Sequence, residues 1–225
     1  MVRASMHTEF KFLMDKIDSA SNPLFLETEI DRLLNIAQDK FVTKRAFGNN
    51  PRRTSFEEDQ KRRDDLRTLI VQSNLTAIDN PINAKPNSQH FSLPDHYRHA
   101  INEEALLYAE ETGTNYRRVS VKPITHDRYN KIIDDPFNKP HKNTVYRLGF
   151  GDDGNICELV HGEDQKISIY YLRYLKEPLQ IQIGQDCILP DHTHREIIRM
   201  AVVEALEGIE SPRYQSSKIE LNEIE

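Results

Sequence analysis

The chain has little of what marks small disulfide-rich, zinc-binding or membrane-spanning proteins. Its 225 residues include two cysteines and no tryptophan. The cysteines, Cys157 and Cys187, are too few and too far apart for a disulfide framework or a zinc site. No apolar run approaches the length of a bilayer span, and the first residues lack the apolar core of a signal peptide. We therefore expect a protein that works or is assembled in a cytoplasm and has no membrane partner.

A basic excess is also lacking. Lysine and arginine number 30 against 36 aspartate and glutamate residues, which gives a formal net charge of −6. A protein whose main partner is nucleic acid usually carries a basic excess. The balance therefore argues against DNA as the main partner, although it leaves local basic patches open.

The familiar catalytic and cofactor motifs are absent as well. There is no Walker loop, GxGxxG, GxSxG or HExxH sequence. Residues 152–155 resemble part of a calcium loop but lack its spaced ligands, so that a hairpin turn is the better interpretation. His96 and His99 could share a helix face, and His192 lies two residues from His194, but no third metal ligand can be identified. We expect no catalytic residue, cofactor or metal.

Apolar residues at helical spacing predict a helical body formed from both ends of the chain. Residues 3–18 and 26–45 each carry one apolar stripe, and a third amphipathic segment follows Pro190. Its predicted buried face comprises Ile197, Ile198, Ala201, Val202, Ala205, Leu206 and Ile209. Pro190 suits a first helical turn, and Gly208, followed closely by Pro212, ends the helix. We expect this helix to pack on the first two.

A further helix is predicted over residues 55–65, but it has almost no apolar face. A helix that is polar all round is either solvated or contacts a charged partner surface. The basic residues of this region are interleaved with acidic ones and comprise Arg52, Arg53, Lys61, Arg62 and Arg63. Mixed-sign patches suit protein–protein contact better than a salt-sensitive grip on phosphate. These five residues are therefore a candidate interface, with an ordinary solvated face as the alternative.

The middle of the chain has the pattern of strands, turns and two short helices. The expected strands span residues 68–71, 105–108, 116–121, 144–150, 156–161, 166–175 and 179–183. Short helices are expected over residues 93–101 and 125–133. Strands grouped between helices favour an α+β fold, in which a helical body carries an inserted, mainly antiparallel β module.

The predicted organisation has four parts along the chain. They are an N-terminal helical part (1–65), the inserted β module (66–184), a C-terminal helix that completes the helical body (185–210) and a polar tail (211–225). The tail is too short to fold alone. It is either a disordered terminus or an arm that orders on a neighbouring molecule by strand addition or groove binding. Its candidate anchors are Ile219, Leu221 and Ile224.

Six stretches of the sequence carry a resemblance to a known group of proteins. They are EIDRLLN (29–35), FSLPDHY (91–97), ITHDRY (124–129), DPFNKP (135–140), IYYLRYLKEP (169–178) and the helix that starts at LP (189–190) and ends in LEGIESPR (206–213). Together they resemble the structural proteins of tailed bacteriophages. The similarity is in particular to the neck or ring proteins of crAss-like phages, which infect Bacteroidetes-type bacteria.

This resemblance implies a non-enzymatic component of the virion neck or tail, assembled in the host bacterial cytoplasm. Proteins of that kind stack as homo-oligomeric rings, often twelvefold, below the portal at the head-to-tail junction, around the DNA channel. The implied partners are further copies of the chain, the portal, neighbouring neck and tail proteins and, without sequence specificity, the packaged DNA. A ring requires contacts between unlike faces of neighbouring copies, for which the mixed-charge residues and the tail are candidates.

Three alternatives stay open. The first is a structural protein placed elsewhere in the virion, in the tail or baseplate. The second is a phage-encoded hydrolase with paired carboxylates among Asp127, Asp134 and Asp135. The third is a regulatory or binding module that acts in the host as a monomer with a basic face. A hydrolase requires clustered acids in a pocket, whereas a ring protein requires complementary surfaces.

Overall fold

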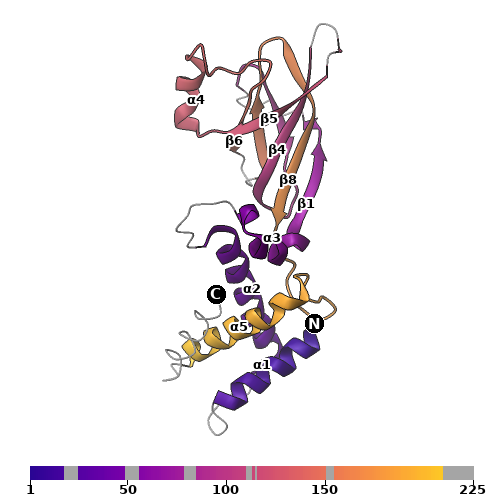
Figure 1. The fold of residues 1–225 in the computed structure, drawn as a ribbon, viewed down its shortest axis with the longest axis vertical. Coiled ribbons are helices and arrows are strands. Elements are labelled where there is room, and N and C mark those ends of the chain that lie inside the picture. Colours follow the sequence, from indigo (N-terminus) through magenta and orange to yellow (C-terminus); the bar gives the residue numbers. More distant parts are fainter. Residues whose placement is uncertain are drawn as a thin grey trace. The chain divides into compact units, whose positions relative to one another are not determined.

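The computed structural model describes residues 1–17, 25–48, 56–78, 85–109, 113–114, 116–150 and 155–209. The chain forms two compact units (Figure 1). The first is discontinuous and combines Met1–Leu69 with Pro178–Glu225, whereas the second is the intervening stretch Ile70–Glu177. The first unit is helical and the second is built on a sheet, which confirms the predicted α+β class.

The junctions between the units differ slightly from the predicted boundaries. They lie after Leu69 and before Pro178, whereas the sequence suggested 65/66 and 184/185. Residues 67–69 form a 3₁₀ turn that continues directly from the preceding helix, and Leu69 is fully buried. At the second junction, the strand expected over residues 179–183 does not form, so that this stretch belongs to the helical unit.

The helical unit is built from elements at both ends of the chain. They are α1 (Arg3–Ile17), α2 (Glu27–Phe47), α3 (Gln60–Leu66), α5 (His194–Gly208) and the 3₁₀ turns Phe56–Glu58, Arg67–Leu69 and Asp191–Thr193. Helix α5 packs against both α1 and α2. Met6, Phe10, Ile30, Leu34, Ile197 and Ala201 are all fully buried. Each large apolar side chain withdrawn from water in this way contributes roughly 1.5–3 kcal/mol.

The predicted face of α5 is confirmed almost completely. Six of its seven predicted apolar positions are buried, and only Ile209, just after the helix, is 37% exposed. Met200 and Val203 are buried in addition, so that the covered face is wider than one stripe. Pro190 precedes a single 3₁₀ turn, after which α5 begins at His194.

The second unit contains one helix and, within the described residues, eight strands. The strands are β1 (Ile70–Leu75), β2 (Ala77–Ile78), β3 (Ser88–Ser92), β4 (Tyr97–Ala109), β5 (Arg117–Pro123), β6 (Val145–Phe150), β7 (Ile156–Val160) and β8 (Gln165–Lys176), and the helix is α4 (His126–Ile133). Their order in the sheet is β1-β8-β4-β5-β6-β7-β3-β2. The first strand of the unit therefore pairs with the last, and the long strands β8 and β4 lie side by side next to it (Figure 1).

One buried cluster fills the concave side of this sheet. Its members include Phe91, Leu107, Val119, Leu159, Tyr170 and Leu172. The rings of Phe91 on β3 and Tyr170 on β8 meet edge to face, with their centroids 5.5 Å apart. Strands β3 and β8 are separated by four others in the sheet order, so that this contact requires the sheet to curl around its own core.

The sheet is antiparallel except for one pair. Strands β5 and β6 are parallel, with Val121 opposite Val145. Parallel neighbours require a crossover connection, and here α4 supplies it. The short helix predicted over residues 125–133 is thereby confirmed. The module is mainly antiparallel, as predicted, with β5 and β6 as its one parallel pair among the described strands.

The buried residues of β8 do not alternate regularly, and this irregularity has a structural cause. The pairing of β4 with β8 shifts between Leu106, which lies opposite Ile169, and Leu107, which lies opposite Ile167. Ser168 is therefore an extra residue in β8, a β-bulge that moves the following side chains to the other face. As a result Tyr170 and Leu172 are buried, whereas Ile169 is only half-buried.

The sequence interpretation was wrong for residues 93–101. It placed a helix there, whereas β4 begins at Tyr97, and it did not predict β3 at Ser88–Ser92. The Leu93-Pro94 sequence that suggested a helix start instead forms a turn, closed by a 2.9 Å bond from Tyr97 N–H to the Pro94 carbonyl. Strand β4 is paired on both sides, by β5 and β8, and such tertiary pairing overrides local propensity.

The strand expected over residues 179–183 is replaced by an extended segment that lies along α2. Asn35 accepts a 2.7 Å hydrogen bond from Ile181 N–H and donates a 3.0 Å bond to the Ile181 carbonyl. Gln38 donates a 3.0 Å bond to the Leu179 carbonyl. Two amide side chains of one helix face thus take the place of a neighbouring strand, and Ile181 is buried against them.

Candidate assembly interface

Helix α3 carries the only part of the predicted charged interface that lies within the described residues. Its N-cap, Asp59, accepts a 3.0 Å bond from Lys61 N–H. Lys61 and Arg63 are exposed, and Arg62 is half-buried, with its Nε 3.8 Å from a carboxylate oxygen of Asp59. Arg52, Arg53, Ile219, Leu221 and Ile224 lie outside the described residues.

The opposite side of α3 is held by a buried network of charges. The Asp65 side chain is only 4% exposed. Its Oδ2 lies 2.8 Å from Arg45 Nε, as a charge pair whose N–H and oxygen are not aligned for a hydrogen bond. Its Oδ1 lies 2.8 Å from His192 Nε2. Arg45 also contacts both carboxylate oxygens of Glu196 at 2.8 Å.

This network fixes the orientation of α3 on the helical unit. Arg45 comes from the last turn of α2, His192 from the 3₁₀ turn before α5 and Glu196 from the first turn of α5. Because Asp65 and Leu66 are both buried, the seven-residue helix has one anchored side and one solvent-facing side. The sequence interpretation missed these residues, since a polar segment gives no signal of which acid is buried.

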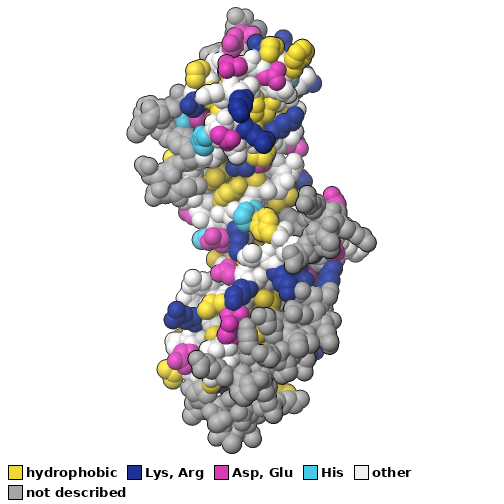
Figure 2. Space-filling view, turned by 90° about the vertical axis from the view of Figure 1, so that its left-hand side faces the viewer, with side chains coloured by type: hydrophobic (Ala, Val, Ile, Leu, Met, Phe, Trp, Pro, Cys, Tyr) yellow, Lys and Arg dark blue, Asp and Glu magenta, His cyan; other side chains and the backbone are white. Residues whose placement is uncertain are grey.

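The surface of the protein is mixed in sign. Figure 2 shows Lys and Arg side chains interspersed with Asp and Glu over the described part of that face, with no broad field of one sign. Ion pairs between such exposed side chains contribute little stability. Their arrangement matters more for the choice and orientation of a partner.

The structure gives the four histidines considered as metal ligands different surroundings from those expected. His99 lies on a strand, which removes the helix face that it was expected to share with His96. His194 is buried and its Nε2 contacts the Leu189 carbonyl at 2.8 Å, whereas His192 faces Asp65. Within the described residues, no group of three or more His, Cys, Asp or Glu could hold a metal ion. Among those same residues, no helix is long and apolar enough to cross a membrane.

Both thiols are unsuited to nucleophilic chemistry. Burial raises the pKa of Cys157 to about 12 and also raises the pKa of Cys187. A reactive cysteine requires the opposite shift, because the thiolate is the nucleophile. Cys187 Sγ instead lies 3.1 Å from Oε1 of Gln38 in the helical core.

Two of the three carboxylates considered for a hydrolase have an environment that does not suit a general acid. Hydrogen bonding by Thr125 lowers the pKa of Asp127, and hydrogen bonding by Asn138 lowers that of Asp135. A general acid at neutral pH requires a raised pKa. Asp135 serves its own loop instead, because it accepts bonds from Phe137 N–H at 2.9 Å and from Asn138 Nδ2 at 2.6 Å.

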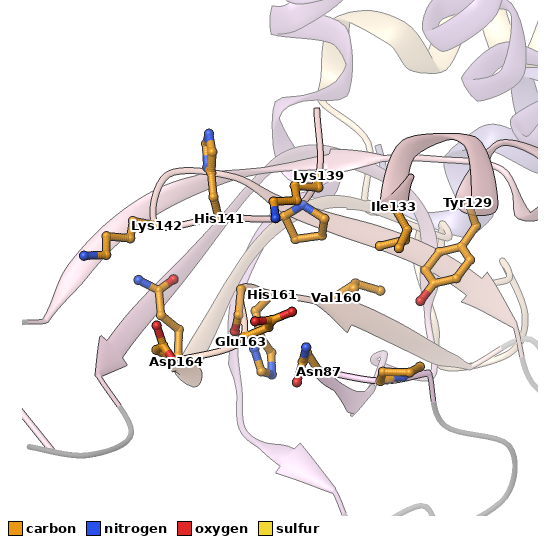
Figure 3. A pocket seen from close by; sticks show the side chains of 14 residues that line it. Asn87, Tyr129, Ile133, Lys139, His141, Lys142, Val160, His161, Glu163 and Asp164 are labelled. Atoms are coloured by element: carbon orange, nitrogen blue, oxygen red, sulfur yellow. Dashed lines mark hydrogen bonds between the residues drawn. The ribbon is translucent and has the colours of Figure 1, made fainter. Parts of the chain in front are cut away.

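A hollow of about 410 Å³ lies beside α4 (Figure 3). Tyr129 and Ile133 of α4 form one end of it, and His161 and Glu163 lie across from Lys139. The hollow contains side chains of both signs and an apolar floor, but none of the three acids considered for hydrolysis is part of its lining. Its chemistry therefore does not single out a substrate.

A second, largely buried charge pair connects strands β4 and β6. Arg147 Nε on β6 lies 2.8 Å from a carboxylate oxygen of Glu103 on β4, and the Tyr170 hydroxyl donates a 2.7 Å bond to the same oxygen. Burial, followed by the charge of Glu103, raises the pKa of Tyr170, so that the phenol stays protonated. The group is enclosed by the sheet, so that its role is to hold the strands in register.

The comparisons with known proteins identify the family of the chain. A family model described as "Phage tail ring protein 3/4" matches residues 1–213. The curated protein "Ring protein 3" of Bacteroides phage crAss001 is 24% identical over 214 residues, which cover 88% of this chain and 91% of that protein. The resemblance to crAss-like ring proteins found in the sequence is thereby confirmed. The chain belongs to the phage tail ring protein 3/4 family, the structural ring proteins of phage tails.

Proposed function

We propose that the chain is the subunit of a homo-oligomeric ring at the head-to-tail junction, below the portal and around the DNA channel. The observation that carries this proposal is the match of residues 1–213 to a tail ring family, because it spans both units. The same family match favours a structural role over a catalytic one. The chain would then be assembled in the host cytoplasm and retained in the virion.

The charged surface of α3 is the proposed contact surface in the helical unit. Lys61, Arg62 and Arg63 extend from a helix whose other side is anchored by Asp65, so that their positions are preorganised. In this proposal these three side chains lie opposite acids on the next copy. A patch of mixed sign would set partner choice more than raw affinity.

The first test is the mass of the full chain in solution, alone and mixed with the portal protein of the same phage. Light scattering should detect a ring of about a dozen copies, or assembly only when the portal is present. Such closed rings arise from heterologous contacts between identical subunits. A monomer under both conditions would contradict the proposal.

Charge reversal tests the α3 surface separately. Lys61→Glu together with Arg63→Glu should weaken assembly and leave the fold unchanged, because both side chains are exposed. Arg199→Glu is the matched control, since Arg199 is an exposed arginine on α5 of the same unit. Equal assembly of the two variants would remove α3 from the interface. Non-specific contact with packaged DNA would appear as binding that falls steeply with salt.

A ring farther along the tail is a second candidate. The family description and the relative's name specify a ring and a tail, but they do not specify the portal as its neighbour. Electron microscopy of virions that carry a tag at the C-terminus of this chain separates the two positions. Density at the head-to-tail junction supports the proposal, whereas density only along the distal tail supports the alternative.

A further inference from the structure

The two edges of the sheet are protected to very different degrees. At one edge, β2 has only two residues. At the other edge, β1 has six residues and pairs with β8 from Ile70 opposite Leu175 to Leu75 opposite Tyr170 without a register shift. Natural proteins keep edge strands from pairing with other chains by making them short, charged, proline-containing or bulged. The β2 edge meets one of these conditions.

The β1 edge meets none of them. Its sequence, IVQSNL, contains no charged residue and no proline, and its pairing with β8 has no bulge. Among the described residues, no other strand pairs with β1 on its outer side. Alternate residues of β1 direct their N–H and C=O groups to β8, and the others direct theirs outward. Among the described residues, these outward-directed groups are not paired with another strand and can accept an additional one.

The side chains of β1 indicate which kind of strand would fit. Val71 and Leu75 pack against the core but remain partly exposed. Gln72 and Asn74 are exposed on the other face, where the guanidinium of Arg173 on β8 reaches across to Gln72 Oε1 at 3.3 Å. An added strand would meet apolar groups on one face and polar groups with a positive charge on the other.

We propose that β1 accepts residues 218–222 of a second copy of this chain as an added strand. This segment reads Lys-Ile-Glu-Leu-Asn, so that its apolar and polar residues alternate with the period of a strand. Ile219 and Leu221 would cover Val71 and Leu75, while Glu220 would lie on the face of Arg173. The segment itself lies outside the described residues, and its fit to β1 rests on this complementarity.

The proposal deepens the proposed function and rests on it. A contact between the tail of one copy and the sheet edge of the next joins two unlike surfaces, and contacts of this type close into rings. It also names the partner of the candidate anchors Ile219 and Leu221. Ile224 lies beyond the alternating stretch and is not required for this contact.

The test uses two complementary variants of the full chain. In the acceptor variant, Gln72→Asp and Asn74→Asp place negative charges beside Arg173 and against Glu220. In the donor variant, Ile219→Asp and Leu221→Asp remove the apolar face of the tail. Ser120→Asp is the control, because Ser120 is exposed on β5 inside the same sheet and away from its edge. Circular dichroism checks that all variants fold as the wild type does.

We expect both variants to associate at least about tenfold more weakly than the wild type and the control. Adding a peptide of residues 213–225 to the donor variant should slow hydrogen exchange of the outward-directed β1 amides. The same peptide with Ile219→Asp and Leu221→Asp should not slow it. Normal assembly of the acceptor variant, or no β1 protection by the peptide, would overturn the inference. Protection of the outward-directed β1 amides, those not bonded to β8, in dilute wild-type monomer would also overturn it, since the tail would then bind its own chain.

Failure of the strand-addition proposal can be distinguished from failure of the proposed ring function. If the wild type forms rings and the acceptor variant does so equally well, only the strand addition is refuted. If the wild type never forms a ring, alone or with the portal, the ring function itself is refuted, whatever the peptide does.

Discussion

Arg45 links three segments of the helical unit through its buried guanidinium. It neutralises Asp65 and Glu196 at once, and its guanidinium also lies over the Phe41 ring, 5.0 Å from the centroid. Removing one partner of a buried charge pair leaves the other charge uncompensated, which costs about 3–5 kcal/mol. We expect Arg45→Met to lower the free energy of unfolding by this amount in urea titrations.

Arg63→Met is the control for this prediction, because Arg63 is an exposed arginine on α3. Surface substitutions of this kind usually change stability by less than about 0.5 kcal/mol. Equal effects of the two substitutions would show that the Arg45 network does not hold the unit together. A double variant, Arg45→Met with Asp65→Asn, should recover part of the loss, because the stranded charge is gone.

His194 makes the helical unit sensitive to mild acid. Burial lowers its pKa, against the opposing effect of its bond to the Leu189 carbonyl. The amino group of Met1, Asp191 and His192 are the charged or titratable groups that act on it. Because the folded-state pKa lies below the unfolded value of about 6.5, the unfolded state binds more protons in acid. Stability should therefore be complete above about pH 6.5 and fall as the pH drops towards the folded-state pKa.

Thermal unfolding between pH 5 and 8 measures this dependence. The wild type should lose stability as the pH falls through this range, whereas His194→Gln should be less stable at pH 8 but flatter with pH. A parallel pH profile for the two proteins would exclude His194 as the cause. Asp31 affects stability at lower pH than His194 does. Burial raises the pKa of Asp31, but the hydrogen bonds from Arg3 and His7 outweigh this effect and lower the pKa.

Among the elements, α2 has an unusual second role as a partner for extended chain. Asn35 binds both backbone groups of Ile181, so that Asn35→Ala leaves a buried N–H and a carbonyl without a partner. Such a loss costs about 1–3 kcal/mol. We expect Asn35→Ala to destabilise the helical unit by this amount, measured by urea unfolding. Arg32→Ala, at an exposed position of the same helix, should be nearly neutral, and a loss as large as that of Asn35→Ala would contradict the assignment.

The quality of the sequence predictions differed between kinds of element. The stripe of α5 was predictable because burial of a helix face leaves a period of 3.6 in the residues themselves. The β4–β5 hairpin, the β6 and β7 strands and α4 were predictable from their alternation and flanking turns. The bulge at Ser168 was not, because the one-residue shift depends on the partner strand. Strand β3 was not predictable either, because it forms as a strand through its pairing with β7, which is distant in the sequence.

At the scale of the whole molecule, the chain passes between the two units twice, after Leu69 and before Pro178. The strand ends next to these two connections pair with each other. Ile70 lies directly opposite Leu175 in the β1–β8 ladder, so that their Cα atoms are about 5 Å apart. We therefore expect that residues 70–177 can be replaced by a short Gly-Ser linker without unfolding the helical unit. Circular dichroism should show a helical protein with a cooperative thermal transition.

The excised residues 70–177 provide the reciprocal test. They contain a complete buried cluster of their own, so that they should fold alone and show β-sheet circular dichroism. Loss of helical structure in the first protein, or of sheet structure in the second, would mean that the two units depend on each other for folding.

The sequence by itself determined the α+β class, the amphipathic helices at both ends, most strands of the inserted unit and the resemblance to phage ring proteins. These depend on local periodicity and on short stretches of residues, which a single chain displays directly. Only the tertiary structure decided that Asp65 is buried beside Arg45, that residues 179–183 lie on α2 and that β1 is an edge strand among the described residues. Each of these depends on which distant residue becomes a neighbour, and sequence spacing carries no record of such partners.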